Sequence, residues 1–308
     1  MIMPPRPSAS PSPGVIALVL ASLFWGTTGT AASFFPSNVS PFAVGASTMA
    51  IGGILLFVVS ARGAIAALAD RRARPWLALG AVGVFVYPLA FYSSMDLAGV
   101  AIGNVVSLGS GPVFAAIFEW LWERHRLSRR WVICTAVAIV GVALLSLGGH
   151  GESGDGTPAT GTGILLGLLA GFSYALYTYA STRAIGAGHA GRSVMGGMFG
   201  LGALALVPVL ILTGAPLLQS PSTLSIAAYL ALGPMFVAYL LFGYGLTRIR
   251  SSAATTITLL EPFVATLLAV LIVGERLGLP GWIGLALILL GVTVIATARQ
   301  RHEGPESP

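Results

Sequence analysis

Two stretches of the sequence, 150 residues apart, follow the same pattern. Residues 111–145 read GPVFAAIFEWLWERHRLSRRWVICTAVAIVGVALL, and residues 261–295 read EPFVATLLAVLIVGERLGLPGWIGLALILLGVTVI. Each stretch has a proline at its second position (Pro112 and Pro262), a Glu-Arg pair near its middle and a Gly-Val pair toward its end. The second half of the chain is therefore predicted to be a copy of the first.

The composition places both copies in a membrane. Hydrophobic residues make up 56% of the chain and charged residues 8%, whereas a soluble domain has roughly a quarter charged residues. Apolar runs of about 18 or more residues, long enough to span a bilayer, recur from end to end. Gly and Pro lie inside many of these runs, which membrane helices tolerate because neighbouring helices satisfy the freed backbone groups. The composition therefore predicts an all-α polytopic membrane protein.

Ten transmembrane helices are predicted, near residues 14–34, 41–61, 75–95, 98–121, 131–148, 162–183, 191–213, 224–246, 253–273 and 280–297. They divide the chain into five parts. These are a disordered N-terminal tail (residues 1–13), a first repeat of five helices (14–148), a linker outside the cytoplasm (149–161), a second repeat of five helices (162–297) and a C-terminal tail (298–308).

Arginine placement predicts how these helices cross the membrane. The sixteen basic residues are all Arg, and basic residues accumulate in cytoplasmic loops. With both termini in the cytoplasm, 15 of the 16 fall on the cytoplasmic side and only Arg276 falls outside. Because each copy has five helices, an odd number, the two copies enter the membrane in opposite orientations. Attraction to an anionic inner leaflet accounts for the arginine clusters, so no nucleic-acid partner is expected.

Motifs for the commonest enzyme and cofactor chemistries are missing from the sequence. Its single cysteine, Cys134, cannot form an intramolecular disulfide, and its four histidines lack the spacing of a metal site. The segment GESGDGT at residues 151–157 lacks the lysine of a phosphate-binding loop. Three acidic residues, Asp70, Asp96 and Glu119, are dispersed rather than clustered near one interface. We therefore expect no cofactor, no metal and no enzymatic activity.

A family resemblance accompanies the repeat. Residues 259–292 read LLEPFVATLLAVLIVGERLGLPGWIGLALILLGV, which closely resembles the C-terminal half of an EamA domain. The doubled ten-helix pattern over residues 14–297 resembles the EamA-type branch of the drug/metabolite transporter superfamily. The first copy departs from the motif by having Gly111 where the second has Glu261. The resemblance implies a bacterial cell-membrane protein that exports small metabolites such as amino acids, often in exchange with a proton or another ion.

Inverted repeats often build a central site where the two copies meet. Every Arg is predicted at a helix end or in a loop, so a phosphorylated solute would find no cation in mid-membrane, and a neutral, zwitterionic or cationic solute is favoured. The candidate binding residues are aromatic and polar residues predicted near mid-membrane, namely Trp25, Thr28, Tyr92, Asn104, Ser107, Tyr174, Tyr177, Tyr239 and Thr258. The alternative is that the hydroxyls only join helices and the aromatics only pack.

Glu261 is the ionisable residue predicted deepest in the bilayer. It lies nine residues beyond Ser252, about 13 Å along a helix, near the middle of a hydrocarbon core about 30 Å thick. A charged side chain there costs about 2.5–3.5 kcal/mol by insertion scales, so Glu261 should face protein or a cavity. Two hypotheses follow. Glu261 is either a structural hydrogen-bonding group or a coupling residue that binds a proton or the amine of the substrate.

The predicted function is a secondary active transporter that exports a small amino-acid-like metabolite by alternating access, with the proton as candidate coupling ion. The alternatives are a channel or structural membrane protein and, less favoured, an integral membrane enzyme. The predicted partners are the metabolite and the lipid bilayer. The sequence leaves open the identity of the substrate, the coupling ion, the direction of net transport and the oligomeric state.

Overall fold

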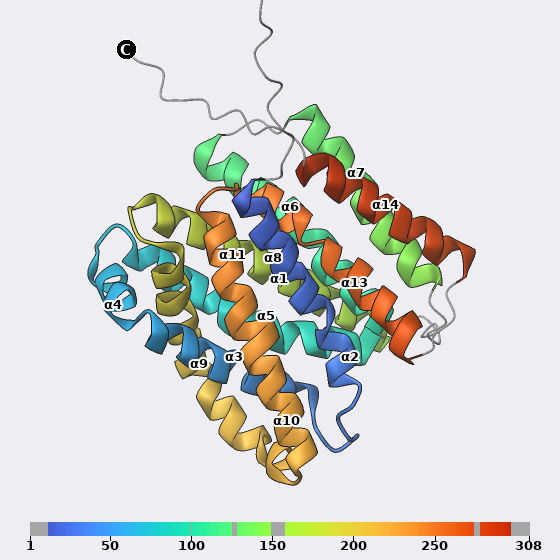
Figure 1. Cartoon of the computed structure of the whole chain (residues 1–308), viewed down its shortest axis with the longest axis horizontal. Helices are drawn as coiled ribbons and strands as arrows, with labels where there is room; N and C mark the ends of the chain where they lie inside the picture. The colour runs from blue at the N-terminus through green and yellow to red at the C-terminus, as the bar shows by residue number, and fades with distance from the viewer. Residues whose placement is uncertain (1–11, 99, 125–127, 149–157, 274–277, 297–308) are drawn as a thin grey trace, which may run out of the picture.

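The computed structural model describes residues 12–98, 100–124, 128–148, 158–273 and 278–296, and these residues form helices without any strand (Figure 1). The first half of the chain contains α1 (Pro13–Gly26), α2 (Thr28–Ala32), α3 (Pro41–Val59), α4 (Ala61–Ala69), α5 (Arg74–Ala98), α6 (Val100–Glu123) and α7 (Arg129–Gly148). The second half contains α8 (Pro158–Gly186), α9 (Gly191–Thr213), η1 (Ala215–Leu218), α10 (Pro221–Leu230), η2 (Ala231–Val237), α11 (Ala238–Leu246), α12 (Ser251–Ile257), α13 (Leu260–Leu268), η3 (Ala269–Val273) and α14 (Leu279–Ala296).

Seven of the described helical segments are long and apolar enough to span a membrane, and α14 adds a shorter apolar helix, Leu279–Val294. The chain is therefore a multi-pass membrane protein. Each of the ten predicted ranges coincides with one helix or with consecutive pieces of one. The ten-span count and the cytoplasmic placement of both termini stay predictions.

Serine-proline pairs begin three of the helical segments. Ser12, Ser40 and Ser220 each precede the first helical residue, a proline, and each side chain accepts a hydrogen bond from a backbone N–H of the first turn. Serine satisfies a donor that the helix cannot pair itself, and proline at the first position has no N–H to satisfy and a backbone angle already suited to the helix. The Pro and Ser residues of these loops therefore fix where α1, α3 and α10 begin.

Several predicted boundaries need correction or fall outside the described residues. Helix α8 begins at Pro158, so the last residues of the predicted linker are helical, and Pro13 of the predicted tail already belongs to α1. The remainder of the linker, the C-terminal tail and the Glu-Arg turn near residue 275 lie outside the described residues. Helix α4 was not predicted, because a helix of nine residues is too short to span a bilayer; it packs against α9 through buried alanines.

The two halves contact each other reciprocally. Helix α3 packs on α9 and α7 packs on α14, and each of these pairs joins equivalent helices of the two repeats (Figure 1). The glycines of the repeated Gly-Val pair explain the second contact. A Cβ on Gly141 would lie 2.7 Å from the Gly284 carbonyl oxygen, and one on Gly291 would lie 2.6 Å from the Cys134 carbonyl oxygen. Only glycine allows the two backbones to approach so closely.

Helices are interrupted in the middle of the bundle. Helix α1 gives way to α2 at Thr27, the π-helical η2 around Pro234 separates α10 from α11, and a turn at Thr258 and Leu259 separates α12 from α13. Because Pro262 has no N–H, the Thr258 carbonyl accepts instead from the Glu261 backbone N–H at 2.9 Å. These interruptions free backbone groups and aim side chains at the interface between the two repeats.

Candidate functional site

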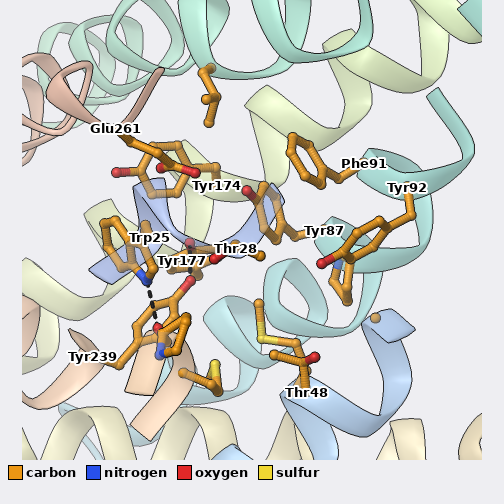
Figure 2. A pocket seen from close by; sticks show the side chains of 16 residues that line it. Trp25, Thr28, Thr48, Tyr87, Phe91, Tyr92, Tyr174, Tyr177, Tyr239 and Glu261 are labelled. Carbon is orange, nitrogen blue, oxygen red and sulfur yellow. Dashed lines mark hydrogen bonds between the residues drawn. The ribbon is translucent and has the colours of Figure 1, made fainter. Parts of the chain in front are cut away.

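A pocket opens where helices from both repeats meet, and Figure 2 shows the side chains around it. Its volume is about 70 Å³. Seven of the ten predicted site residues line it, namely Trp25, Thr28, Tyr92, Tyr174, Tyr177, Tyr239 and Glu261. Sequence positions more than 230 residues apart therefore share one cavity, and it lies at the repeat interface, where the inverted repeats led us to expect one.

Hydroxyl groups and rings hold the aromatic wall of the cavity in place. The Tyr177 and Tyr239 hydroxyls lie 2.8 Å apart, and the Tyr174 hydroxyl lies 2.7 Å from Thr258 Oγ1. Trp25 packs on Tyr239 with ring centroids 5.1 Å apart, and its indole N–H donates to a backbone carbonyl of η2 at 2.8 Å (Figure 2). Because the polar tips of Trp25, Tyr174, Tyr177 and Tyr239 are all partnered, these four rings present their faces and edges to the cavity in a fixed arrangement.

Glu261 supplies the carboxyl group of this cavity. Its side chain is half-buried and points into the pocket beside Tyr174 (Figure 2). No hydrogen bond or ion pair joins its carboxylate to any residue that the structure describes, and the lining contains no Arg, Lys or His. Glu261 stands in the first turn of α13, whose positive end favours a negative charge. The carboxylate is therefore free to bind a group that enters the cavity.

The other three predicted residues lie outside the lining. Thr258 stands one hydrogen bond behind Tyr174 and supports it. Ser107 is fully buried in α6, and its hydroxyl finds no hydrogen-bond partner among the described residues. The side chain of Asn104 lies outside the described residues. Their predicted roles in binding, like those of the lining residues, stay predictions.

Sequence analysis missed part of the lining. Thr48 and Met49 of α3 and Met235 of η2 are among the further residues that line the pocket. Thr48 bonds the Val44 carbonyl at 2.7 Å, an ordinary arrangement for a threonine in a membrane helix. Nothing in the sequence distinguishes such a threonine from those that only pack. For Met235, the neighbouring Pro234 is the sequence signal, because a proline inside an apolar run marks a helix interruption.

Glu119 also has a role that the sequence did not predict. The carboxylate is buried in α6, with 2% of the residue exposed. It accepts hydrogen bonds from the Ser251 hydroxyl at 2.7 Å, the Ser252 hydroxyl at 2.7 Å and the Ser252 backbone N–H at 2.9 Å. These three bonds join the last turns of α6 to the start of α12. We call Glu119, Ser251 and Ser252 the serine latch.

A weaker cluster lies one turn beyond the serine latch. Glu123, at the end of α6, accepts from the Tyr179 hydroxyl at 3.3 Å and from Arg183 and Arg250 at 3.4 Å each. These side chains come from α6, from α8 and from the loop before α12. The three segments are therefore tied together at the end of the bundle that is predicted to face the cytoplasm.

The side chains of the cavity are suited to recognising a small solute. The cavity presents aromatic faces, hydroxyl groups and one carboxylate, a set that suits a small solute carrying a cationic or hydrogen-bonding group. Among the described residues, no three His, Cys, Asp or Glu side chains gather in a way that could hold a metal ion.

Comparison with known sequences gives a consistent family. The model of the EamA-like transporter family matches residues 12–147 and 161–297. An uncharacterized transporter, YwfM of Bacillus subtilis, is 33% identical over 292 residues, which are 94% of this chain and 96% of that protein. The threonine/homoserine exporter RhtA of Escherichia coli is 28% identical over 86% of this chain and 84% of its own length. A probable terminal-alkyne amino-acid exporter of Streptantibioticus cattleyicolor is 28% identical over 92% and 93%.

A solved structure shares the fold. It aligns with a TM-score of 0.77 at 23% identity and covers 92% of this chain and 96% of its own. At this level of identity the likeness concerns the arrangement of the helices.

Proposed function

Since the chain belongs to the EamA-like transporter family, we propose that it is a secondary active transporter that exports a small, amine-bearing, amino-acid-like metabolite. The chain is a membrane transporter, and transport rather than catalysis is its proposed activity. Transport is proposed to follow alternating access between the two repeats, with the cavity at their interface as the substrate site. The proposed coupling ion is the proton.

One observation carries this proposal, namely a carboxyl group that has no partner among the described residues and lies in an aromatic cavity whose lining has no cationic side chain. A substrate ammonium group is attracted by the faces of Trp and Tyr and by the carboxylate of Glu261. A phosphorylated solute would instead meet a negative charge with no cation to offset it. Two relatives named as exporters of amino acids support the same substrate class.

The geometry also supports a state that is closed toward the cytoplasm. The serine latch and the Glu123 cluster tie α6, α8 and α12 together at the predicted cytoplasmic end. Part of the cavity lining comes from α2, the first turns of α3 and the second half of α5. These segments lie toward the predicted outer side of the membrane. Export would require this latch to open so that substrate can enter, and to close again before release.

The volume of the cavity supports movement as part of the mechanism. Ligand pockets usually hold roughly 300–1,000 Å³, and this cavity holds about 70 Å³. A metabolite therefore needs the walls to separate. The interruptions at Thr27, η2 and Thr258 lie beside the cavity, and helix breaks at such positions are where membrane helices bend.

The test of the proposed function is exchange transport by purified protein in liposomes. Vesicles loaded with an unlabelled solute are expected to take up labelled threonine or homoserine in a saturable way. N-acetylation removes the ammonium charge, so the acetylated amino acids should exchange at least roughly tenfold more slowly, as expected for the loss of about 1.4 kcal/mol or more of charge recognition. Equal exchange of the acetylated forms would contradict recognition of the amine, and exchange of sugar phosphates alone would contradict the substrate class.

A further inference from the structure

A second pocket, distinct from the central cavity, lies at the predicted cytoplasmic end of the bundle. It has a volume of about 390 Å³ and lies between α5, α6 and α8. Its lining combines two cations, one carboxylate, one indole ring and small or hydroxyl-bearing residues, namely Arg72, Arg183, Glu123, Trp76, Thr182, Gly186 and Ala187. The transport cycle proposed above uses Glu123 and Arg183 to hold helices together, and it assigns no ligand to this pocket.

Arg72 is held at the mouth of this pocket by its backbone. The carboxylate of Asp70 accepts the Arg72 backbone N–H at 2.9 Å and also contacts His189 at 2.9 Å, which ties the turn before α5 to the loop after α8. The bond from the Arg72 backbone, followed by the contact with His189, lowers the pKa of Asp70, so this anchor stays ionised near neutral pH. The guanidinium of Arg72 makes no hydrogen bond or ion pair with any residue that the structure describes.

The remaining charges leave the pocket positive. Arg183 stacks over the Trp76 ring with its guanidinium carbon 5.2 Å from the centroid, and it lies 3.4 Å from Glu123. The carboxylate of Glu123 is shared with Arg250, also at 3.4 Å. Glu123 is thus shared by two arginines, and Arg72 lies near a second carboxylate, that of Asp70, so three arginines face two acidic groups. Helix α8 ends at Gly186 beside the pocket, and Arg183 in its last turn offsets the negative helix end.

The pocket also lies beside a wall that suits the lipid interface. The Trp76 ring contacts the Trp122 ring edge-on, with centroids 6.3 Å apart. Trp120 and Trp122, both on the last turn of α6, are 59% and 52% exposed. Exposed tryptophans gather at the level of lipid headgroups. With the predicted topology, these tryptophans would place the pocket near the level of the lipid headgroups of the cytoplasmic leaflet.

We propose that this pocket binds the phosphate of an anionic phospholipid headgroup from the cytoplasmic leaflet. Arg72 supplies a guanidinium that makes no hydrogen bond to the described residues, and Arg183 is held on Trp76 as the second cation. Guanidinium groups match phosphate oxygens in geometry as well as charge. A lipid bound here would contact α5, α6 and α8 at the same time and so hold them together, next to the hydrogen bonds and ion pairs of Glu123.

Native mass spectrometry of the full-length protein in detergent tests this site. The protein is titrated separately with phosphatidylglycerol, with phosphatidylcholine and with inorganic phosphate. A first, saturable phosphatidylglycerol adduct is expected, with phosphatidylcholine and phosphate binding at least roughly tenfold more weakly. Arg72→Gln should weaken that adduct roughly tenfold, because one charge-assisted contact to the phosphate is lost. Arg71→Gln removes an exposed arginine of the same turn outside the lining and should leave the affinity unchanged.

Other outcomes would overturn the assignment. Equal binding of phosphatidylcholine would show that the headgroup charge is not recognised. Inorganic phosphate that displaces the adduct at low millimolar concentration would make the ligand a soluble phosphate instead of a lipid. Unchanged affinity in both Arg72→Gln and Arg183→Gln would remove the pocket from lipid binding altogether.

Discussion

Glu261→Gln is expected to abolish transport driven by a pH gradient while leaving exchange transport in place. Glutamine keeps the size of the side chain and its hydrogen-bonding capacity but cannot gain or lose a proton. The carboxylate has no partner among the described residues, so its substitution breaks no internal contact and the variant should fold like the parent. If Glu261 carries the coupled proton, gradient-driven accumulation in liposomes should fall at least roughly tenfold.

Exchange without a gradient needs no proton transfer, so the Gln variant should retain it at saturating substrate. Its KM for the amine-bearing substrate should rise, because the carboxylate charge no longer attracts the ammonium group. Glu261→Asp, which keeps the ionisable group, is the matched control and should recover part of the gradient-driven transport. If the Gln variant accumulates substrate as well as the parent does, Glu261 is a structural residue and the proton is coupled elsewhere.

Glu119→Ala is expected to favour the state that is open to the cytoplasm. The substitution removes all three bonds of the serine latch and leaves two hydroxyls and a backbone N–H without their acceptor. Hydrogen bonds to a charged group contribute about 1.5–3 kcal/mol each, so even one such loss shifts the balance between the two states roughly tenfold or more. Net transport should fall by a similar factor, because closing toward the cytoplasm becomes the slow step.

A separate readout distinguishes a latch from a merely structural carboxylate. If the latch holds the cytoplasmic side shut, opening it raises the fraction of protein that substrate can enter from that side. The apparent affinity for substrate on the cytoplasmic side should therefore rise while turnover falls. Glu119→Gln, which retains one carbonyl acceptor, should show both changes to a smaller degree. A fall in affinity and turnover together, with loss of folded protein, would mean that Glu119 only stabilises the bundle.

Much of the fold could be predicted because the membrane restricts the choices. Backbone groups in hydrocarbon must pair within a helix, so apolar length alone located the helical segments. The repeat marked Gly141 and Gly291 as equivalent positions, but their close contact between α7 and α14 was not predicted and is seen only in the structure. Helix interruptions were harder to predict. Pro234 lies within the π-helical η2, whereas the end of α1 at Thr27 has no comparable signal.

The site residues of unusual type for a membrane helix could be predicted from the sequence, whereas those of common type could not. An acidic residue and several aromatic residues predicted near mid-membrane stand out in an apolar sequence, and Trp25, Tyr174 and Glu261 do line one cavity. Thr48 looks like any packing threonine. Glu119 finds its partners in serines more than 130 residues along the chain, and only the tertiary fold brings those groups together.

The most direct measurement of alternating access through this cavity is the accessibility of a single cysteine at position 28. Thr28 lines the cavity from α2, on its predicted outer side, and Cys134→Ala removes the natural thiol. A membrane-impermeant thiol reagent added outside cells should modify Thr28→Cys, and substrate should slow this reaction severalfold. Adding Glu119→Ala to the same chain should also slow modification from outside. In inverted vesicles, the same double variant should be modified faster from the cytoplasmic side. An Asn38→Cys control on the exposed loop before α3 should react from outside regardless of substrate. Modification of position 28 at equal rates from both sides, unaffected by substrate or by Glu119→Ala, would contradict alternating access and indicate a continuously open channel.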